Sequence, residues 1–405
     1  MTILFRESSP GPSYDKKKGP SKLLAKFQRG RIYLLALLLL TLFLVTRNPR
    51  IRYEQLNGDR VVDFSVLEIP DHAKEHSHSG MPLPWAVSYS PYTSSGSCKG
   101  LGAIADDLQA IEKSGIESVR LYSLDCRVLQ ASQATGLNIV LGLQPNTEQD
   151  SSSGHLKQLI DSVESQLQDI TRWGHWERIS MLVVGSQGVF EEAYTRAELV
   201  KLLRYVKLSV SRQKGFKGLI TTAEPVQSWI SPTRYNAASL KEYKLYQQYE
   251  SQRKLEDFDF FADIEDNDLC EAVDVIGLVV EPYFNSAAEA EHAGQTLLRD
   301  VKHAHQLCSD EFIGSAHTDV TPSENTSKRP VVVLEAGWPN TGTDNGHALA
   351  NENEQRIAIE EMITARLAST GARVPVSLYS FEDELWREPG DLKVETAFGV
   401  QKLYR

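Results

Sequence analysis

The sequence predicts an α/β protein of the (β/α)8 TIM-barrel class. From Pro84 onward, short apolar runs rich in β-branched residues alternate with stretches of helical periodicity. Continuous apolar strands that alternate with helices indicate a parallel sheet covered by helices. Eight such runs, spread over about 300 residues, favour a closed barrel over an open sheet. No Gly-x-Gly-x-x-Gly pattern follows the first run, which argues against dinucleotide binding.

The expected strands are short and are separated by amphipathic stretches. They cover residues 85–92, 118–124, 138–143, 179–185, 218–223, 273–280, 330–335 and 374–381. Helices are expected between them, for example over 102–113, 195–212, 287–307 and 353–369. In the second of these helices, one apolar face is formed by Leu199, Leu202, Leu203 and Val206.

Three parts of different composition precede the expected barrel, which covers residues 84–405. Residues 1–31 form a basic tail, with eight Lys and Arg against two acidic residues. Residues 32–46 form an apolar run, and 47–83 would form a stem or linker. The run of 15 residues would span roughly 22 Å as a helix, which is shorter than a typical hydrocarbon core of ~30 Å.

We expect residues 32–46 to be an uncleaved transmembrane signal anchor. A cleaved signal peptide is the alternative, but Arg47, Arg50 and Arg52 follow the run without a small-residue cleavage site. Because the larger basic cluster precedes the run, the positive-inside rule places the N-terminus in the cytosol and the body in the lumen. A short span suits early secretory membranes. The expectation is a single-pass type II membrane protein of the endoplasmic reticulum, the Golgi or the cell surface.

The charge distribution excludes one class of partner. The net charge is −11 although residues 1–31 are basic, so the body is acidic and offers no footprint for nucleic-acid phosphates. A neutral polysaccharide is compatible with such a surface. We expect no cofactor and no metal. His72, His76 and His78 lie in the expected stem without another ligand cluster nearby, which favours a solvated linker.

Four cysteines lie on the expected lumenal side, and their even number predicts two disulfides. Three connectivities are possible. The preferred one joins neighbours along the chain, Cys98 with Cys126 and Cys270 with Cys308, because each pair would close a local loop. No Cys-x-x-Cys pattern suggests a zinc site. The sequon at Asn325 fits a glycosylated lumenal loop.

The seventh expected strand ends in Glu335, followed by Ala336-Gly337-Trp338-Pro339. Active sites of such barrels form at the carboxyl ends of the strands. A carboxylate at a strand end beside a Trp suits the nucleophile of a retaining glycosidase, with the aromatic ring stacking on a sugar. The alternative is a turn with a Trp in the core.

The chain also resembles glycoside hydrolase family 17, the β-1,3-glucanases, and in particular its fungal cell-wall branch. The shared motifs follow one another in order along residues 84–402. They are Tyr89-Ser90-Pro91-Tyr92-Thr93, Val119-Arg120-Leu121-Tyr122-Ser123, Thr221-Thr222-Ala223, Pro282-Tyr283-Phe284, Glu335-Ala336-Gly337-Trp338-Pro339 and Phe381-Glu382-Asp383-Glu384-Leu385-Trp386. The resemblance implies a TIM barrel with its acid/base after the fourth strand and its nucleophile after the seventh. Glu335 matches the nucleophile, and the implied ligand is β-1,3-glucan or an oligosaccharide of it.

The chain departs from the family where the acid/base is expected. The family's Val-Gly-Asn-Glu is Val184-Gly185-Ser186-Gln187 here. Gln187 can donate a hydrogen bond to a glycosidic oxygen but cannot give it a proton. The family's Asn-x-His-Pro is Val279-Val280-Glu281-Pro282. Glu281 is therefore a candidate for the missing acid, with a solvated or ion-paired glutamate as the alternative.

The remaining candidate substrate contacts are polar or aromatic residues at the expected barrel mouth. They are Tyr89, Arg120, Tyr122, Ser186, Trp338, Glu384 and Trp386. Two functions remain open. One is a slow retaining glycosidase or transglycosidase, and the other is a glucan-binding pseudoenzyme or scaffold in the secretory pathway or cell wall. A glycosyltransferase of a biosynthetic pathway ranks below both, because the chain has no nucleotide-sugar motif.

Overall fold

The computed structural model describes residues 62–69, 77, 79–147, 155–230, 268–308, 329–368 and 371–405, which belong to the unit Arg60–Arg405. The expected tail, the expected anchor at 32–46, the histidine cluster and Asn325 lie outside these ranges. Within the described ranges, no helix is long and apolar enough to cross a membrane.

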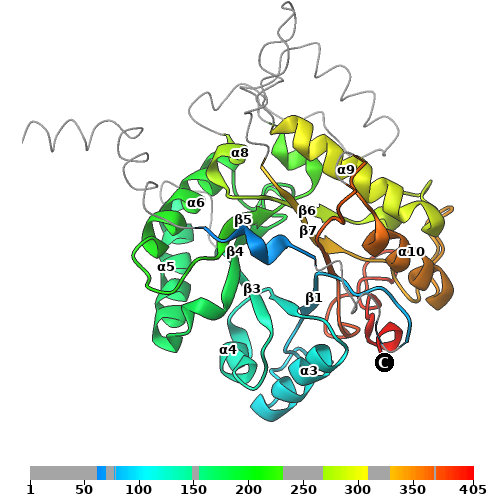
Figure 1. Ribbon diagram of the computed structural model, residues 1–405, viewed down its shortest axis with the longest axis horizontal. Helices are drawn as coiled ribbons and strands as arrows, with labels where there is room; N and C mark the ends of the chain where they lie inside the picture. The colour runs from blue at the N-terminus through cyan, green and yellow to red at the C-terminus, as the bar shows by residue number, and fades with distance from the viewer. Residues whose placement is uncertain are drawn as a thin grey trace, which may run out of the picture. The chain divides into compact units, whose positions relative to one another are not determined.

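Eight parallel strands form the centre of the fold, in the order β5-β4-β3-β2-β1-β8-β7-β6 (Figure 1). The strands are β1 (Ala86–Tyr89), β2 (Ser118–Leu121), β3 (Asn138–Leu143), β4 (Ile179–Ser186), β5 (Leu219–Ala223), β6 (Ile276–Val280), β7 (Val331–Ala336) and β8 (Val376–Leu378). Each overlaps the run in which a strand was expected. The first strand, β1, pairs with the last, β8, so the sheet bends round into a barrel. The prediction of a (β/α)8 barrel is confirmed.

The ring closes between β5 and β6 through one residue that follows β5. The N–H of Glu224 donates to the carbonyl of Gly277 at 3.1 Å, and the Glu224 carbonyl accepts from the N–H of Val279 at 3.1 Å. The strands come this close because residue 277 has no side chain. A Cβ at Gly277 would lie 2.1 Å from the carbonyl oxygen of Thr222.

Helices surround the strands, as Figure 1 shows. They are α3 (Leu101–Lys113), α4 (Val128–Ser132), α5 (His155–Trp173), α6 (Arg196–Val210), α8 (Leu269–Ala272), α9 (Ala293–Leu307) and α10 (Glu352–Thr364). α6 begins at a capping box, in which Thr195 and Glu198 bond each other's backbone N–H groups. The apolar face expected on this helix is buried.

The barrel interior is filled by large apolar side chains, including Trp85, Met181, Val183 and Leu334. Residues 62–69, within the stretch expected to be a stem, pack against this interior. The indole N–H of Trp85 donates to the carbonyl of Val66 at 2.7 Å. Since Trp85 precedes β1, the segment covers the amino-terminal end of the barrel and leaves the carboxyl ends of the strands open.

Two disulfides join neighbouring cysteines along the chain. Cys98 pairs with Cys126, with a Cα–Cα distance of 5.2 Å, and Cys270 pairs with Cys308 at 5.4 Å. Both preferred pairings are confirmed. The first disulfide ties the loop after β1 to the segment after β2, beside the open end of the barrel.

Closure of the barrel predicts a strong dependence on Gly277. We expect Gly277→Ala to lower the free energy of unfolding by at least about 2 kcal/mol, because the new methyl group meets the backbone of Thr222. Gly102→Ala is the matched control, since a Cβ there meets no atom within 4 Å, and it should change stability by less than about 1 kcal/mol. Urea denaturation measures both. Equal stability of the two variants would contradict the described seam.

Candidate active site

A cleft of about 650 Å³ lies at the carboxyl ends of the strands. Strand ends contribute Tyr89, Tyr122, Ser186, Gln187 and Glu335 to its lining, and the following loops contribute Glu191, Glu384, Trp386 and Arg387. These residues are far apart in the sequence, and the ring of strands brings them together. The position agrees with the rule that such barrels place their active sites at this end.

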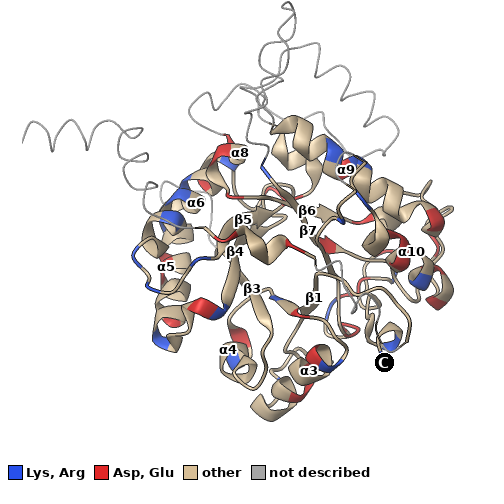
Figure 2. Ribbon diagram, in the orientation of Figure 1, with Lys and Arg blue, Asp and Glu red and all other residues tan. Residues whose placement is uncertain are grey.

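Two charged residues occur in the eight strands, and they bind each other. They are Arg120 in β2 and Glu335 in β7, whereas the outer helices carry many charges (Figure 2). Their exposed fractions are 1% and 5%, and Nη1 of Arg120 lies 2.7 Å from Oε2 of Glu335. A charge buried alone would be unstable, so each residue requires the other.

Arg120 connects three strands beneath the cleft and is not itself among the residues that line it. Besides Glu335, its guanidinium donates to the carbonyl of Leu334 in β7 at 2.7 Å and to the hydroxyl of Ser186 in β4 at 3.2 Å. It also lies over the ring of Tyr122, at 4.4 Å from the centroid. This network fixes the guanidinium and, through it, the carboxylate of Glu335.

Tyr122 supplies the second hydrogen bond to the same carboxylate oxygen. Its hydroxyl donates to Oε2 of Glu335 at 2.8 Å. Burial raises the pKa of Tyr122 well above its ordinary value, so the phenol keeps its proton and remains a donor. The other oxygen of Glu335, Oε1, receives neither of these donors.

Glu384 forms a second buried carboxylate beside the first. It is 5% exposed, accepts from the hydroxyl of Tyr379 at 2.7 Å and lies 3.7 Å from a guanidinium nitrogen of Arg387. Burial raises its pKa, and the charge of Glu335 adds to the rise. Oε1 of Glu384 is buried without a hydrogen-bond partner among the described residues.

The aromatic residues of the site divide between cleft and core. Trp386 lines the cleft and is 39% exposed, and its ring packs against Tyr92 with centroids 5.1 Å apart. Trp338, which was expected at the substrate, is fully buried and donates its indole N–H to the carbonyl of Leu349 at 2.8 Å. Because no part of the Trp338 ring is exposed, Trp338 cannot contact a ligand in the cleft, whereas part of the Trp386 ring lies open on it.

Tyr89 lies at the end of β1 and lines the cleft, but its hydroxyl is already engaged. It donates to Asp107 of α3 at 2.7 Å, and the same carboxylate oxygen binds Lys99 at 2.7 Å. Its burial is almost complete, at 1% exposed. Tyr89 therefore shapes the wall of the cleft and holds α3 to the strand.

The altered acid/base motif lies at the end of β4, in the cleft. Ser186 and Gln187 both line it. Gln187 has a φ of 56°, and its N–H donates to the carbonyl of Ala223 at 2.7 Å. Glu191, a few residues later, also lines the cleft, and its N–H donates to the carbonyl of Gln187 at 2.8 Å. Glu281, which follows β6, is not among the residues that line the cleft.

Three important residues were not singled out from the sequence. Tyr379 and Arg387 hold Glu384, and Glu224 binds the loop after β4. Glu224 directly follows an expected strand, so a search for a carboxylate at every strand end would have found it. Tyr379 and Arg387 carry no comparable signal, because their role depends on the fold of the loop after β8.

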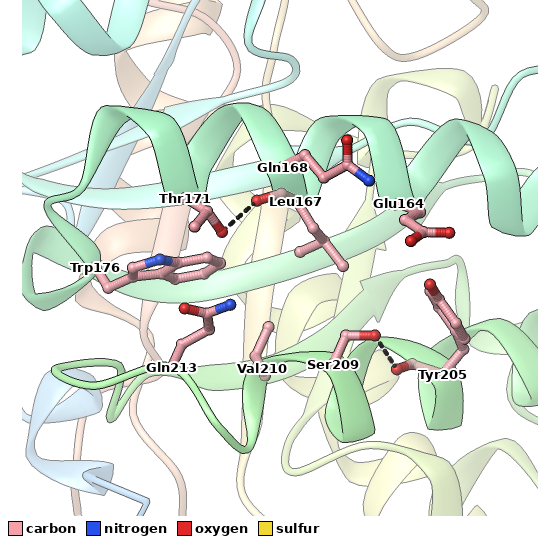
Figure 3. A pocket seen from close by; sticks show the side chains of 9 residues that line it. All are labelled: Glu164, Leu167, Gln168, Thr171, Trp176, Tyr205, Ser209, Val210 and Gln213. Carbon is pink, nitrogen blue, oxygen red and sulfur yellow. Dashed lines mark hydrogen bonds between the residues drawn. The ribbon is translucent and has the colours of Figure 1, made fainter.

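A second, smaller cavity lies between α5 and α6, as Figure 3 shows. The hydroxyl groups of Thr171 and Ser209 are used within their own helices. Thr171 donates to the carbonyl of Leu167 at 2.8 Å, and Ser209 donates to the carbonyl of Tyr205 at 2.9 Å. Within the described ranges, no group of three His, Cys, Asp or Glu residues could hold a metal ion.

Comparison with known families agrees with this geometry. Residues 86–242 and 238–399 match the family described as the BtgE/BtgC glycoside hydrolase domain. The chain belongs to this family. A family member from Aspergillus terreus, a probable β-glucosidase btgE, is 26% identical over 317 residues, which are 77% of this chain and 45% of that protein. Its counterpart in Emericella nidulans is 28% identical over 281 residues, 68% of this chain and 40% of that protein. The chain spans less than half the length of these BtgE relatives.

Two solved structures share the fold of this BtgE/BtgC domain. An active-site mutant of Rhizomucor miehei β-1,3-glucanosyltransferase, in complex with laminaritriose, has a TM-score of 0.53 and 16% identity and covers 78% of this chain and 91% of that one. An endo-laminarinase from Formosa Hel1_33_131 has a TM-score of 0.51 and 15% identity and covers 78% and 82%. The first enzyme is described as a member of glycoside hydrolase family 17.

The buried ion pair predicts a large difference between two arginine substitutions. Arg120→Met should lower the free energy of unfolding by about 3–5 kcal/mol, because it leaves the Glu335 carboxylate buried without its partner. Arg356→Met removes an exposed pair with Glu360 and should cost less than about 1 kcal/mol. Chemical denaturation at neutral pH compares them. If the two variants lose the same stability, Arg120 is not the residue that stabilises Glu335.

Proposed function

We propose that this chain is a retaining glycosidase or transglycosidase that acts on β-1,3-glucan or a related β-glucoside. The observation that carries the proposal is the placement of Glu335, at the end of β7 and in the floor of the cleft, with Arg120 and Tyr122 donating to the same carboxylate oxygen. The name β-glucosidase given to relatives and the laminaritriose bound by a structural neighbour support the substrate class.

In this proposal, Glu335 is the nucleophile. Arg120 and Tyr122 hold Oε2 in place through their hydrogen bonds, and Oε1 attacks the anomeric carbon of the sugar. The bond from this carbon to the glycosidic oxygen breaks as the bond to Glu335 forms, which gives a glycosyl-enzyme. The departing oxygen takes up a proton from solvent. Water or a sugar hydroxyl then attacks the anomeric carbon, loses its proton to solvent and releases the Glu335 carboxylate. Trp386 is exposed on the same cleft and can stack on a sugar ring.

Among the described residues, the cleft has no proton donor at the position where the leaving group departs, and this limits the first step of the reaction. Gln187 stands where a carboxylic acid would protonate the departing oxygen, and an amide has no such proton to give. Glu281 is not among the residues that line the cleft, so we assign no proton transfer to it. General acid catalysis is worth about 10²–10⁴-fold, and its absence should slow cleavage of unactivated glucan far more than cleavage of an activated glycoside.

Gln187 also favours a second candidate function, that of a non-catalytic glucan-binding protein. A site that has kept its sugar-binding walls but lost its acid/base can retain affinity without turnover. The two functions differ in one property that can be measured. An enzyme forms a bond between Glu335 and the sugar, whereas a binding protein does not.

An activated substrate provides the first test. The leaving group of 2,4-dinitrophenyl β-laminaribioside is 2,4-dinitrophenolate, which needs little protonation. Wild-type protein should therefore cleave this substrate. Glu335→Ala should lower this activity by at least about a thousandfold, whereas Glu360→Gln, an exposed carboxylate in α10, should not change it. Release of dinitrophenolate measures the rate. Absence of wild-type cleavage, with retained binding of laminari-oligosaccharides, would favour the non-catalytic function.

Restoring the carboxylic acid provides the second test. Gln187→Glu should raise the hydrolysis of laminarin by at least about tenfold, a cautious part of the general-acid contribution. Gln187→Asn, which keeps an amide, is the matched control and should bring no gain. Reducing-sugar release measures the activity. No gain in a folded Gln187→Glu variant would show that other changes in the site, such as Ser186, also prevent turnover.

We also propose that the barrel lies in the lumen of the secretory pathway or at the cell surface, held by an anchor at residues 32–46. The two disulfides of the barrel support an oxidising compartment. In sealed microsomes the barrel should resist added protease until detergent is present. Digestion without detergent would place the barrel on the cytosolic side.

A further inference from the structure

Glu224 is a buried carboxylate with no role in the chemistry above. Its side chain is fully buried, and its two oxygens accept from the backbone N–H groups of Val189 and Phe190 at 3.0 and 3.2 Å. These amides lie within the turn between Gln187 and Glu191, and both ends of that turn line the cleft. The carboxylate therefore binds the turn that carries the altered acid/base position.

Building on the proposed function, we propose that Glu224 is a positioning residue that fixes the loop after β4, so that Gln187 and Glu191 form one wall of the cleft. Glu224 is not among the residues that line the cleft, so it acts through the loop and not on the sugar. The loop then places the amide of Gln187, which can donate a hydrogen bond to the departing oxygen but cannot give it a proton.

The backbone of Glu224 makes it a rigid point of attachment. Its N–H and carbonyl close the barrel against Gly277 and Val279 of β6, and its carbonyl also accepts from the indole N–H of Trp229 at 3.3 Å. The loop is thus joined to the seam of the barrel instead of to another loop. A shift of the Glu224 backbone would require a shift of the strands.

The loop is built around this attachment. The N–H groups of Ala193 and Tyr194 donate to the carbonyl of Gly188, which turns the chain back toward the barrel. The Tyr194 ring occupies the space beside Gly185 and Gly188, where an added Cβ would lie 2.0 and 2.1 Å from its atoms. The glycines on either side of Gln187 therefore admit a buried tyrosine under the loop, and the loop has little freedom to adopt another path.

The electrostatic environment of Glu224 shows that burial opposes its charge. Burial raises the pKa of Glu224 to about 7, the neighbouring charge of Glu191 adds to the rise, and the hydrogen bonds from Val189, Phe190 and Ser228 lower it. A carboxylate kept in such a place requires these bonds. In Glu224→Gln, the side-chain NH2 group would face one of the two backbone N–H groups. Both groups are donors, so no hydrogen bond could form between them.

Hydrogen exchange tests the structural half of the proposal without reference to activity. In full-length Glu224→Gln, peptides that cover residues 187–194 should exchange at least about tenfold faster than in wild type, as expected for a lost hydrogen bond to a charged group. Peptides from α10 should be unchanged. Glu360→Gln, a carboxyl-to-amide change on that exposed helix, should alter neither region. Unchanged exchange at 187–194 in a folded Glu224→Gln variant would overturn the proposal.

Two leaving groups test the catalytic half. Phenyl β-laminaribioside needs help at the leaving oxygen, and the 2,4-dinitrophenyl substrate needs little. Glu224→Gln should lower kcat for the phenyl substrate at least about tenfold more than for the dinitrophenyl substrate, with KM changed less than about threefold. Glu224→Asp, which keeps the charge, should recover part of the loss. Equal losses on both substrates would overturn the positioning role. If wild type cleaves neither substrate, the proposed function fails, and hydrogen exchange alone still decides whether Glu224 fixes the loop.

Discussion

The ion pair between Arg120 and Glu335 is the constraint on which the site depends. These are the charged residues of an eight-stranded barrel whose other strand positions are apolar or uncharged. Removing two charges from water is expensive, and the attraction between them repays the cost only with good geometry and further hydrogen bonds. The chain supplies those bonds from Tyr122, from Leu334 and from Ser186. The pair is therefore better explained by a function at the cleft than by stability.

The two sides of the cleft have different chemical capacities. On the side of β7 and β8, Glu335 and Glu384 are held by Arg120, Tyr122, Tyr379 and Arg387. On the side of β4, an amide replaces the expected acid. A site of this kind is suited to forming a glycosyl-enzyme when the leaving group departs easily. It is poorly suited to expelling a sugar alkoxide, which explains why cleavage and binding both remain candidate activities for the same geometry.

Much of this architecture can be predicted from the sequence, for identifiable reasons. Buried parallel strands are continuous apolar runs, so all eight were found, and a carboxylate at the end of β7 was found with them. The disulfide pairing followed from loop closure. What was missed depends on contacts between distant segments. Trp338 is a core residue because the segment at Leu349 accepts its N–H. Residues 62–69 are mostly apolar, but they belong to a stretch expected to be a linker, and their packing against Trp85 becomes visible only in the fold.

We propose that Glu335, oriented by Arg120 and Tyr122, is a working nucleophile. The most direct measurement is trapping with 2,4-dinitrophenyl 2-deoxy-2-fluoro-β-laminaribioside, followed by intact-mass analysis and peptide mapping. The fluorine slows the displacement of the enzyme from the sugar, so the glycosyl-enzyme should accumulate. We expect one sugar per chain, on the peptide that contains Glu335, and none in Glu335→Ala. A protein that binds laminari-oligosaccharides but is never labelled, or is labelled on another carboxylate, would contradict it.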